Sequence, residues 1–138
     1  MLQSELDLQF KTLLDQYYTA WSRSWDEPLS LYAKDANAVY YDVHPPVGGY
    51  TTWNSYLEAA KGFFAKAEFV QITPSDDQQV TRKGDVAWST GSFHLLAKQQ
   101  NGTTVELDCR VTLVWEKRHE KWLIVHEHLS APLSGSYT

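Results

Sequence analysis

Cysteine is nearly absent from this sequence, and long apolar runs are absent altogether. Cys109 is the single cysteine, so an internal disulfide is excluded, and we expect its thiol to be buried. No segment approaches the roughly 20 apolar residues that a membrane helix needs. The stretch MLQSELDLQFK carries acids where a signal peptide has a basic region and an apolar core. We therefore expect a soluble, cytoplasmic protein that does not bind a membrane.

Clustered basic residues are also missing. The 12 lysines and arginines are outnumbered by 17 acids, which gives a net charge of −5, and no basic run is longer than a pair such as Lys117-Arg118. A surface that follows the phosphates of a nucleic acid needs clustered lysine and arginine. The composition therefore argues against nucleic-acid binding.

Aromatic side chains are what the sequence has in excess: 6 Trp, 8 Tyr and 5 Phe make up 14% of the chain. The hydrophobic share of 43% and the charged share of 21% are ordinary for a globular protein. A length of 138 residues leaves room for a single domain, residues 1–138. So many rings predict a large aromatic core, a ring-lined pocket or a buried interface.

Three helices are predicted in the first half of the chain. Apolar residues recur at spacings of three and four over 6–21, which is a helical stripe, and Ser4 is placed to cap it. A second, short helix is predicted over 26–33, because Asp26 can cap it and a proline suits its first turn. A third helix is predicted from about Thr52 to Ala67, with its aromatic residues on one side.

The rest of the chain is rich in β-branched and aromatic residues, which is typical of strands. A first strand over 37–43 precedes the third helix and ends at His-Pro-Pro. The later strands are predicted at 68–73, 78–82, 86–98, 104–116 and 122–130. Because helices come first and a strand meander follows, the fold class is α+β and not alternating α/β.

The turn at Asn101-Gly102 decides which residues of two long strands share a face. A two-residue turn would mix polar and apolar side chains on both faces, whereas a three-residue loop with Gly102 as a left-handed bulge residue separates them. The second register pairs Leu95 with Leu107 and Phe93 with Cys109 on an apolar face. A buried sheet requires one apolar face, so we favour this register.

Extending the register through a loop at 118–120 places one acid on the apolar, inner face. Glu127 falls there opposite Val111, and Leu129 falls opposite Cys109. The outer face is too aromatic for free solvent and too polar for a core, so an interface fits it best. The residues predicted for a homodimer interface are Trp88, His94, Arg110, Trp122, His126 and His128.

The order of elements and several motifs resemble the SnoaL-like, nuclear-transport-factor-2-like (NTF2-like) proteins. The motifs are YYDVHPP, the glycine before the third helix, VTLVWEKRHEKW and WLIVHEHLSAP, and the likeness covers nearly the whole chain. The resemblance implies a cone-shaped fold with N-terminal helices packed on a strongly curved, mostly antiparallel sheet. It also implies a pocket on the concave face and dimerisation through the convex face. The fold hosts isomerases, cyclases, dehydratases and targeting domains, so it implies little about the reaction.

The association domain of calcium/calmodulin-dependent kinase is similar through the last three strands. The resemblance implies pocket arginines that bind small carboxylates in those proteins. The matching positions here are Phe93, Leu113 and Leu129, all apolar. Carboxylate binding of that kind is therefore not expected.

Ketosteroid isomerases offer a second comparison. Their catalytic Asp lies near the end of the first strand, and Asp42 is its nearest match. Their helix-one Tyr falls near Tyr17 or Tyr18. Their second acid, which donates to the developing enolate, would fall near Val111 or Thr112, so that half of the oxyanion hole is missing.

Two acid–base candidates follow from the residues themselves. Glu127 on an apolar face would be desolvated, which raises the pKa of a carboxyl and suits it to general acid or base work. The alternative is that the strand bulges or frays near Ser130 and the carboxyl reaches water. Asp42 and His44 are two residues apart and share a face if the strand continues. An Asp before His-Pro-Pro is equally typical of a strand-ending turn.

The pair His126 and His128 has a spacing that metal sites use, with His94 and Asp108 on the same face. Arg110 opposite His128 would repel a cation, and the face is the expected dimer surface. We therefore predict a structural role for these histidines, and no metal.

A pocket for a flat, mainly apolar ligand is expected between the helices and the sheet. The predicted lining consists of Tyr17, Tyr18, Trp21, Tyr41, Phe93, Val111, Leu113 and Leu129. Two functions stay open. One is an isomerase or lyase without a cofactor that uses Asp42, Glu127 or His44; the other is a non-catalytic domain for ligand binding or oligomerisation. A catalytic site needs a titratable group inside the pocket, whereas a binding module needs only shape.

Overall fold

Three long strands form the centre of the fold: β4 (Val86–Gln99), β5 (Thr104–Arg118) and β6 (Lys121–Ser130). The computed structural model describes residues 7–24, 26–34 and 38–133. The three strands pair as an antiparallel meander. Their β-branched and aromatic content, divided by a glycine-containing turn, favours this arrangement.

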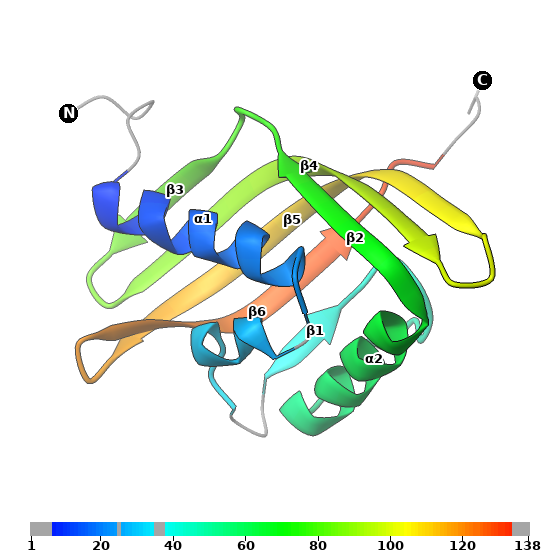
Figure 1. Cartoon of the computed structure of the whole chain (residues 1–138). Coiled ribbons are helices and arrows are strands. Elements are labelled where there is room, and N and C mark those ends of the chain that lie inside the picture. Colours follow the sequence, from blue (N-terminus) through cyan, green and yellow to red (C-terminus); the bar gives the residue numbers. More distant parts are fainter. Residues whose placement is uncertain (1–6, 25, 35–37, 134–138) are drawn as a thin grey trace.

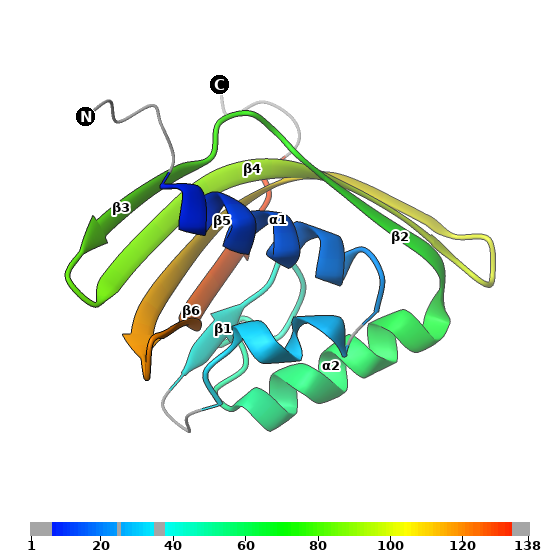
Figure 2. The ribbon, with the colours of Figure 1, turned by 60° about the vertical axis from the view of Figure 1, so that its left-hand side comes forward.

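Three further strands extend the sheet, whose order is β1-β6-β5-β4-β2. β2 (Ala67–Pro74) and β3 (Gln79–Lys83) both pair with β4 in antiparallel fashion, while β1 (Val39–Tyr41) is parallel to β6. Figure 2 shows how strongly the sheet curves around its inner face. The predicted α+β class with a mostly antiparallel sheet is confirmed.

The helices cover the concave side of this sheet. α1 (Leu8–Trp21) lies across the inner face, and α2 (Trp53–Lys66) lies beside β1 and the start of β2 (Figure 1). The segment predicted as a second helix is a short 3-10 helix, η1 (Glu27–Leu31). Among the described residues, neither α-helix combines the length and apolar character of a membrane span.

Local capping explains where the α-helices begin. The Asp7 carboxylate accepts a hydrogen bond from the Gln9 backbone N–H at 2.9 Å and so caps α1. The predicted cap, Ser4, lies outside the described residues. At α2, the Thr52 hydroxyl accepts from the Ser55 N–H at 3.1 Å, in agreement with the predicted start.

The β4–β5 register is the one that the apolar-face argument favours. Leu95 pairs with Leu107 and Phe93 with Cys109, and Gly102 has a φ of +91° in the loop. Phe93 and Cys109 are both buried on the inner face. Burial raises the pKa of the Cys109 thiol to about 11, so the thiol stays protonated near neutral pH.

The β5–β6 register differs from the prediction. His119 (φ 51°) and Glu120 (φ 64°) form a two-residue turn in place of the predicted three-residue loop. The ladder then shifts between Val114 and Trp115, where a bulge takes up one residue of β6. Glu127 therefore pairs with Leu113 and not with Val111, but it returns to the inner face.

This shift also corrects the outer-face assignment of Trp122. The two-residue turn directs Trp122 and Ile124 inward, and they are 2% and 0% exposed. The Trp122 ring lies 4.9 Å from that of Phe10, centroid to centroid, in the core between α1 and the sheet. The prediction that Trp122 belongs to an outer interface is wrong.

Candidate functional site

A cavity of about 410 Å³ lies between the two α-helices and the inner face of the sheet. Its lining is mostly aromatic and aliphatic. The aromatic part consists of Tyr17, Tyr18, Trp21, Tyr56, Phe63, Phe64 and Phe93. The aliphatic part includes Val70, Ile72, Leu95, Val105, Leu107 and Leu129. No lysine or arginine of the described residues lines the cavity, so its wall carries no fixed positive charge.

Asp42 and His44 bring a carboxylate and an imidazole to this wall. His44 Nε2 lies 3.5 Å from Asp42 Oδ2, and the Asp42 side chain is 20% exposed against 50% for His44. The other carboxylate oxygen, Oδ1, accepts from the Val43 N–H at 2.6 Å. β1 ends at Tyr41, so the pair stands in the turn that follows the strand. The turn thus brings both side chains to the cavity.

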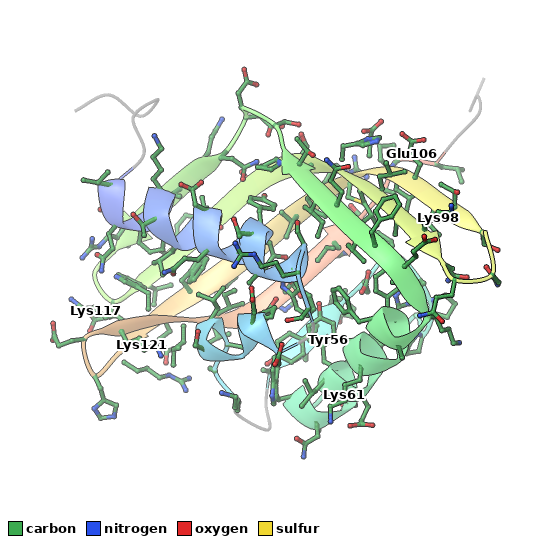
Figure 3. All side chains as sticks on the ribbon, in the orientation of Figure 1. Tyr56, Lys61, Lys98, Glu106, Lys117 and Lys121 are labelled. Carbon is green, nitrogen blue, oxygen red and sulfur yellow. The ribbon has the colours of Figure 1, made fainter. Side chains whose placement is uncertain are left out.

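Glu127 lies behind the wall, in a group that we call the tyrosine cluster: Glu127, Tyr17, Tyr32 and Tyr56. Tyr17 and Tyr32 donate their hydroxyls to Glu127 Oε2, the latter at 2.8 Å, and Tyr56 donates to Oε1. The phenols come from α1, from the segment after η1 and from α2; Figure 3 labels Tyr56 on α2. Three elements therefore meet on one carboxylate.

The carboxyl of Glu127 is fully buried, at 0% exposed. β6 continues to Ser130, so the alternative in which a frayed strand lets this carboxyl reach water is wrong. Burial raises the pKa of Glu127 to about 7, although the hydrogen bonds from Tyr17, Tyr56 and Tyr32 work against that rise. Near neutral pH the protonated and the ionised carboxyl are therefore both populated.

The three phenols of the cluster stay protonated. Burial, and next the adjacent Glu127 charge, raise the pKa values of Tyr17, Tyr32 and Tyr56 well above the ordinary value. Each phenol therefore has one hydrogen to donate. Tyr32 also accepts a hydrogen bond from Trp21 Nε1 at 2.9 Å, which ties the cluster to another side chain of the cavity wall.

The residues predicted to bind a ligand divide into three groups. Tyr17, Tyr18, Trp21, Phe93 and Leu129 line the cavity. Val111 and Leu113 are buried in the core at 4% and 0% exposed and are not among the described lining residues. Tyr41 lies on the opposite face of the sheet.

Tyr41 packs against the outer-face histidines. Its ring centroid lies 5.8 Å from that of His126 and 5.0 Å from that of His128. Only alternate residues of a strand share a face, and Tyr40 takes the inward position at 0% exposed. The prediction that Tyr41 faces the pocket is wrong.

Trp88, His94 and Arg110 lie on the outer face, as the β4–β5 register predicts. Trp88 is 38% exposed, and the Arg110 Nε–H donates to the Ser130 hydroxyl at 3.2 Å. His94 lies between Asp108 and Glu106, with 2.8 Å from a ring nitrogen to each carboxylate. Those hydrogen bonds, first the one from Asp108, raise the pKa of His94. No group of three or more metal-ligating side chains converges anywhere in the described part of the chain.

Sequence reasoning missed Tyr32 and Tyr56 as members of the site. A buried carboxylate needs donors, and that need is a signal once Glu127 is placed on the inner face. Which phenols supply the donors depends on how α1, η1 and α2 pack, and residues 17, 32, 56 and 127 are far apart in the chain. The sequence pattern does not contain that packing.

Comparisons with known proteins agree with the fold. The model of the SnoaL-like domain matches residues 11–134. Among curated proteins, none matches the sequence significantly. An NTF2-like superfamily protein from Salmonella enterica serovar Typhimurium superposes with a TM-score of 0.81 at 19% identity, over 94% of this chain and 93% of that one.

Two further solved structures are similar to this chain. A proposed dehydratase of the NTF2-like family from Streptomyces avermitilis has a TM-score of 0.77 at 21% identity, over 92% of this chain and 97% of that one. A proposed ketosteroid isomerase from Shewanella frigidimarina has a TM-score of 0.67 at 24% identity, over 86% and 92%. At these identities the likeness shows the NTF2-like fold alone.

Proposed function

The chain belongs to the SnoaL-like domain family, and we propose that it binds a small, mainly apolar ring compound in its cavity and moves a proton on it, as an isomerase or lyase. The observation that carries the proposal is the Asp42–His44 pair, which stands at the wall of an otherwise apolar and aromatic cavity. A carboxylate and an imidazole in such a place suit general acid–base chemistry.

The cavity supports the choice of ligand. Its volume of about 410 Å³ lies within the range of small-molecule sites, and aromatic rings favour a flat partner. Because no lysine or arginine of the described residues lines it, the ligand is neutral and not a carboxylate or a phosphate. The apolar Phe93 and Leu129 in the lining are consistent with this choice.

The proposed step is proton removal from a carbon next to a carbonyl group. Asp42 takes the proton, and the electron pair of the C–H bond passes through the carbon–carbon bond to the carbonyl oxygen, which gives an enolate. Return of the proton to a different carbon completes an isomerisation. Alternatively, a group leaves from the β-carbon and takes up the proton, which completes an elimination. His44 assists by holding the Asp42 carboxylate in place.

The names of two similar structures support this class of reaction. The protein from Streptomyces avermitilis is a proposed dehydratase, which is a lyase, and that from Shewanella frigidimarina is a proposed ketosteroid isomerase. Isomerisation of a ketone and loss of water from a hydroxy ketone can both proceed by removal of a proton beside a carbonyl group. Neither name identifies the substrate of this chain.

The proposal is tested with 2-tetralone, a flat two-ring ketone with exchangeable protons beside its carbonyl. In deuterated buffer we expect the protein to accelerate loss of those proton signals, measured by NMR. The change Asp42→Asn removes the base, so we expect the rate to fall by roughly 100-fold or more. Asp108→Asn is the matched control, because Asp108 also pairs with a histidine but lies on the outer face.

The outcomes are distinct. Equal rates for the wild type and Asp42→Asn would refute a role for Asp42 as the base. Binding of 2-tetralone without any exchange would favour the alternative, a non-catalytic ligand-binding domain. That alternative has one observation behind it, since the fully buried Glu127 is separated from the cavity by Tyr17 and Tyr56.

A further inference from the structure

The tyrosine cluster brings three hydroxyl hydrogens to one carboxyl group. With Glu127 ionised, Tyr17, Tyr32 and Tyr56 all donate to it. A phenol has a single hydrogen, so each hydroxyl is then fully committed as a donor. Tyr17 and Tyr56, which line the cavity, can offer only their oxygen lone pairs to a ligand. In this state these two phenols, which we call the inner wall of the cavity, accept hydrogen bonds from a ligand but do not donate to it.

Protonation of Glu127 changes this arrangement. The new O–H must itself donate, and the atoms around the carboxyl are the phenol oxygens of the cluster. Tyr32 already accepts from Trp21 Nε1 at 2.9 Å, which leaves Tyr17 or Tyr56 as the better acceptor. A phenol that accepts from Glu127 must direct its own hydrogen elsewhere, and both of these side chains border the cavity.

We propose that Glu127 is a positioning residue that decides, through Tyr17 and Tyr56, whether the inner wall of the cavity donates a hydrogen bond to the ligand. The ligand class that this selects is a neutral ring compound with a carbonyl group, bound when Glu127 holds its proton. The inference rests on the proposed function, since it requires a ligand in the cavity. Glu127 does not touch that ligand; it acts through the phenols.

The titratable groups around Glu127 come from the helices and the turn after β1, while β5 pairs the apolar Leu113 with it. They are Tyr17 and Tyr18 of α1, Tyr32 after η1, Tyr56 of α2 and Asp42 after β1, with His44 beside Asp42. Tyr40 on β1 is paired with Glu127 in the sheet but donates its hydroxyl to the Ala33 carbonyl at 3.0 Å. Burial, and to a smaller extent the Asp42 charge, raise the pKa of Glu127 to about 7, so both states occur near neutral pH.

The first experiment uses the wild-type protein without ligand. Tyrosine labelled with carbon-13 at the ring carbon that bears the hydroxyl is followed by NMR from about pH 5 to about pH 9. We expect the signals of Tyr17, Tyr32 and Tyr56 to move together with one midpoint, and the movement to vanish in Glu127→Gln. Signals that do not move, or that move with unrelated midpoints, would overturn the inference.

The second experiment measures the affinity for 2-tetralone by calorimetry. We expect binding to be about five- to tenfold tighter at about pH 5.5 than at about pH 8.5, the effect of one added hydrogen bond. In Glu127→Gln, whose amide keeps the shape of the side chain, affinity is expected to be independent of pH. His44→Gln, which removes the imidazole beside Asp42, is expected to retain the pH dependence. Asp42→Asn removes a charge that raises the pKa of Glu127, so the same dependence is expected with its midpoint at a lower pH.

The two experiments separate the proposals. A pH dependence that survives Glu127→Gln but disappears in His44→Gln would overturn the inference and leave the proposed ligand class intact. Failure of 2-tetralone to bind at either pH would count against the proposed function, while the NMR titration of the free protein still decides the behaviour of the cluster. Because that titration uses wild-type protein, its result stands even where Glu127→Gln does not fold.

Discussion

Glu127 is predicted from the sequence to lie on the inner face, and it is a buried carboxyl that three phenols bind. A carboxyl at 0% exposed is costly unless hydrogen bonds compensate for lost water. Here three phenols supply them, from segments that otherwise have little in common. The same contacts hold α1, the segment after η1 and α2 against β6, so a single side chain ties three segments to the sheet.

The raised pKa of Glu127 predicts how stability depends on pH. The pKa of about 7 in the folded protein is above the ordinary value of 4.5 for a glutamate, so the folded state binds the proton more tightly than the unfolded chain does. Stability from this group is therefore largest at low pH and is lost as pH rises from 4.5 toward 7. We expect the unfolding free energy of the wild type, relative to Glu127→Gln, to fall by roughly 2 to 3 kcal/mol between about pH 5 and about pH 8.

Urea denaturation of both proteins at each pH measures this difference. The exposed His94, whose pKa is raised by Asp108 and Glu106, is present in both and cancels. A difference that stays constant with pH would show that Glu127 has an ordinary pKa and is not desolvated. A difference that grows with pH would contradict the sign of the predicted shift.

At the scale of elements, the β5–β6 hairpin shows how a sequence pattern can be misread. Two-residue turns in which both residues have positive φ favour Asn-Gly, but this turn is His119-Glu120. Because neither His nor Glu is typical of such a turn, the residue pattern predicts a three-residue loop instead. The turn places Trp122 on the inner face, and the later bulge brings Glu127 back to that face. The face of Glu127 was therefore predicted correctly although its partner was not.

This turn gives a prediction for stability. Residues other than glycine and asparagine are strained at φ values of 51° and 64°. We expect the double change His119→Asn and Glu120→Gly to raise the unfolding free energy by about 1 kcal/mol, because it relieves that strain. Chemical denaturation measures the gain.

A matched control isolates the charge of Glu120. Lys117 Nζ lies 3.5 Å from Glu120 Oε2, but the Glu120 side chain is 92% exposed, so the ion pair contributes little. Glu120→Gln removes the charge and keeps the strained backbone, and we expect it to leave stability nearly unchanged. A double variant no more stable than Glu120→Gln would show that the turn is not strained.

Other elements were predicted well because their signals are local. α2 begins at Trp53, one residue from the predicted start, and the Asn101-Gly102 turn sets every pair between β4 and β5. Such signals depend on residues close together in the chain. The tyrosine cluster depends instead on tertiary packing, which places Tyr32 and Tyr56 beside Glu127. That is why the acid of the site could be predicted while two of its three partners could not.

At the scale of the whole molecule, the aromatic residues fall into three populations. Phe10, Trp115 and Trp122 form part of the core between α1 and the sheet, with ring centroids 5.6 Å and 4.9 Å from Phe10. Others line the cavity, and a third group lies on the outer face. The composition predicts rings in a core, a pocket or an interface, and the structure has them in both the core and the cavity wall. The third group raises the question of a partner.

The exposed aromatic and polar side chains of the outer face indicate a homodimer interface, and a change at Trp88 tests this prediction. Its ring is 38% exposed on β4, on the same face as Tyr41, His126 and His128. Large aromatic side chains at the centre of an interface account for much of its binding energy. We expect the wild type to sediment as a dimer in analytical ultracentrifugation, and Trp88→Lys to weaken the dimer at least about tenfold, because a buried, unpaired lysine opposes association. Leu8→Lys is the control, since Leu8 is 77% exposed on α1, and it should leave the dimer unchanged. A monomeric wild type would refute the prediction, and equal weakening by both variants would move the interface away from the outer face of the sheet.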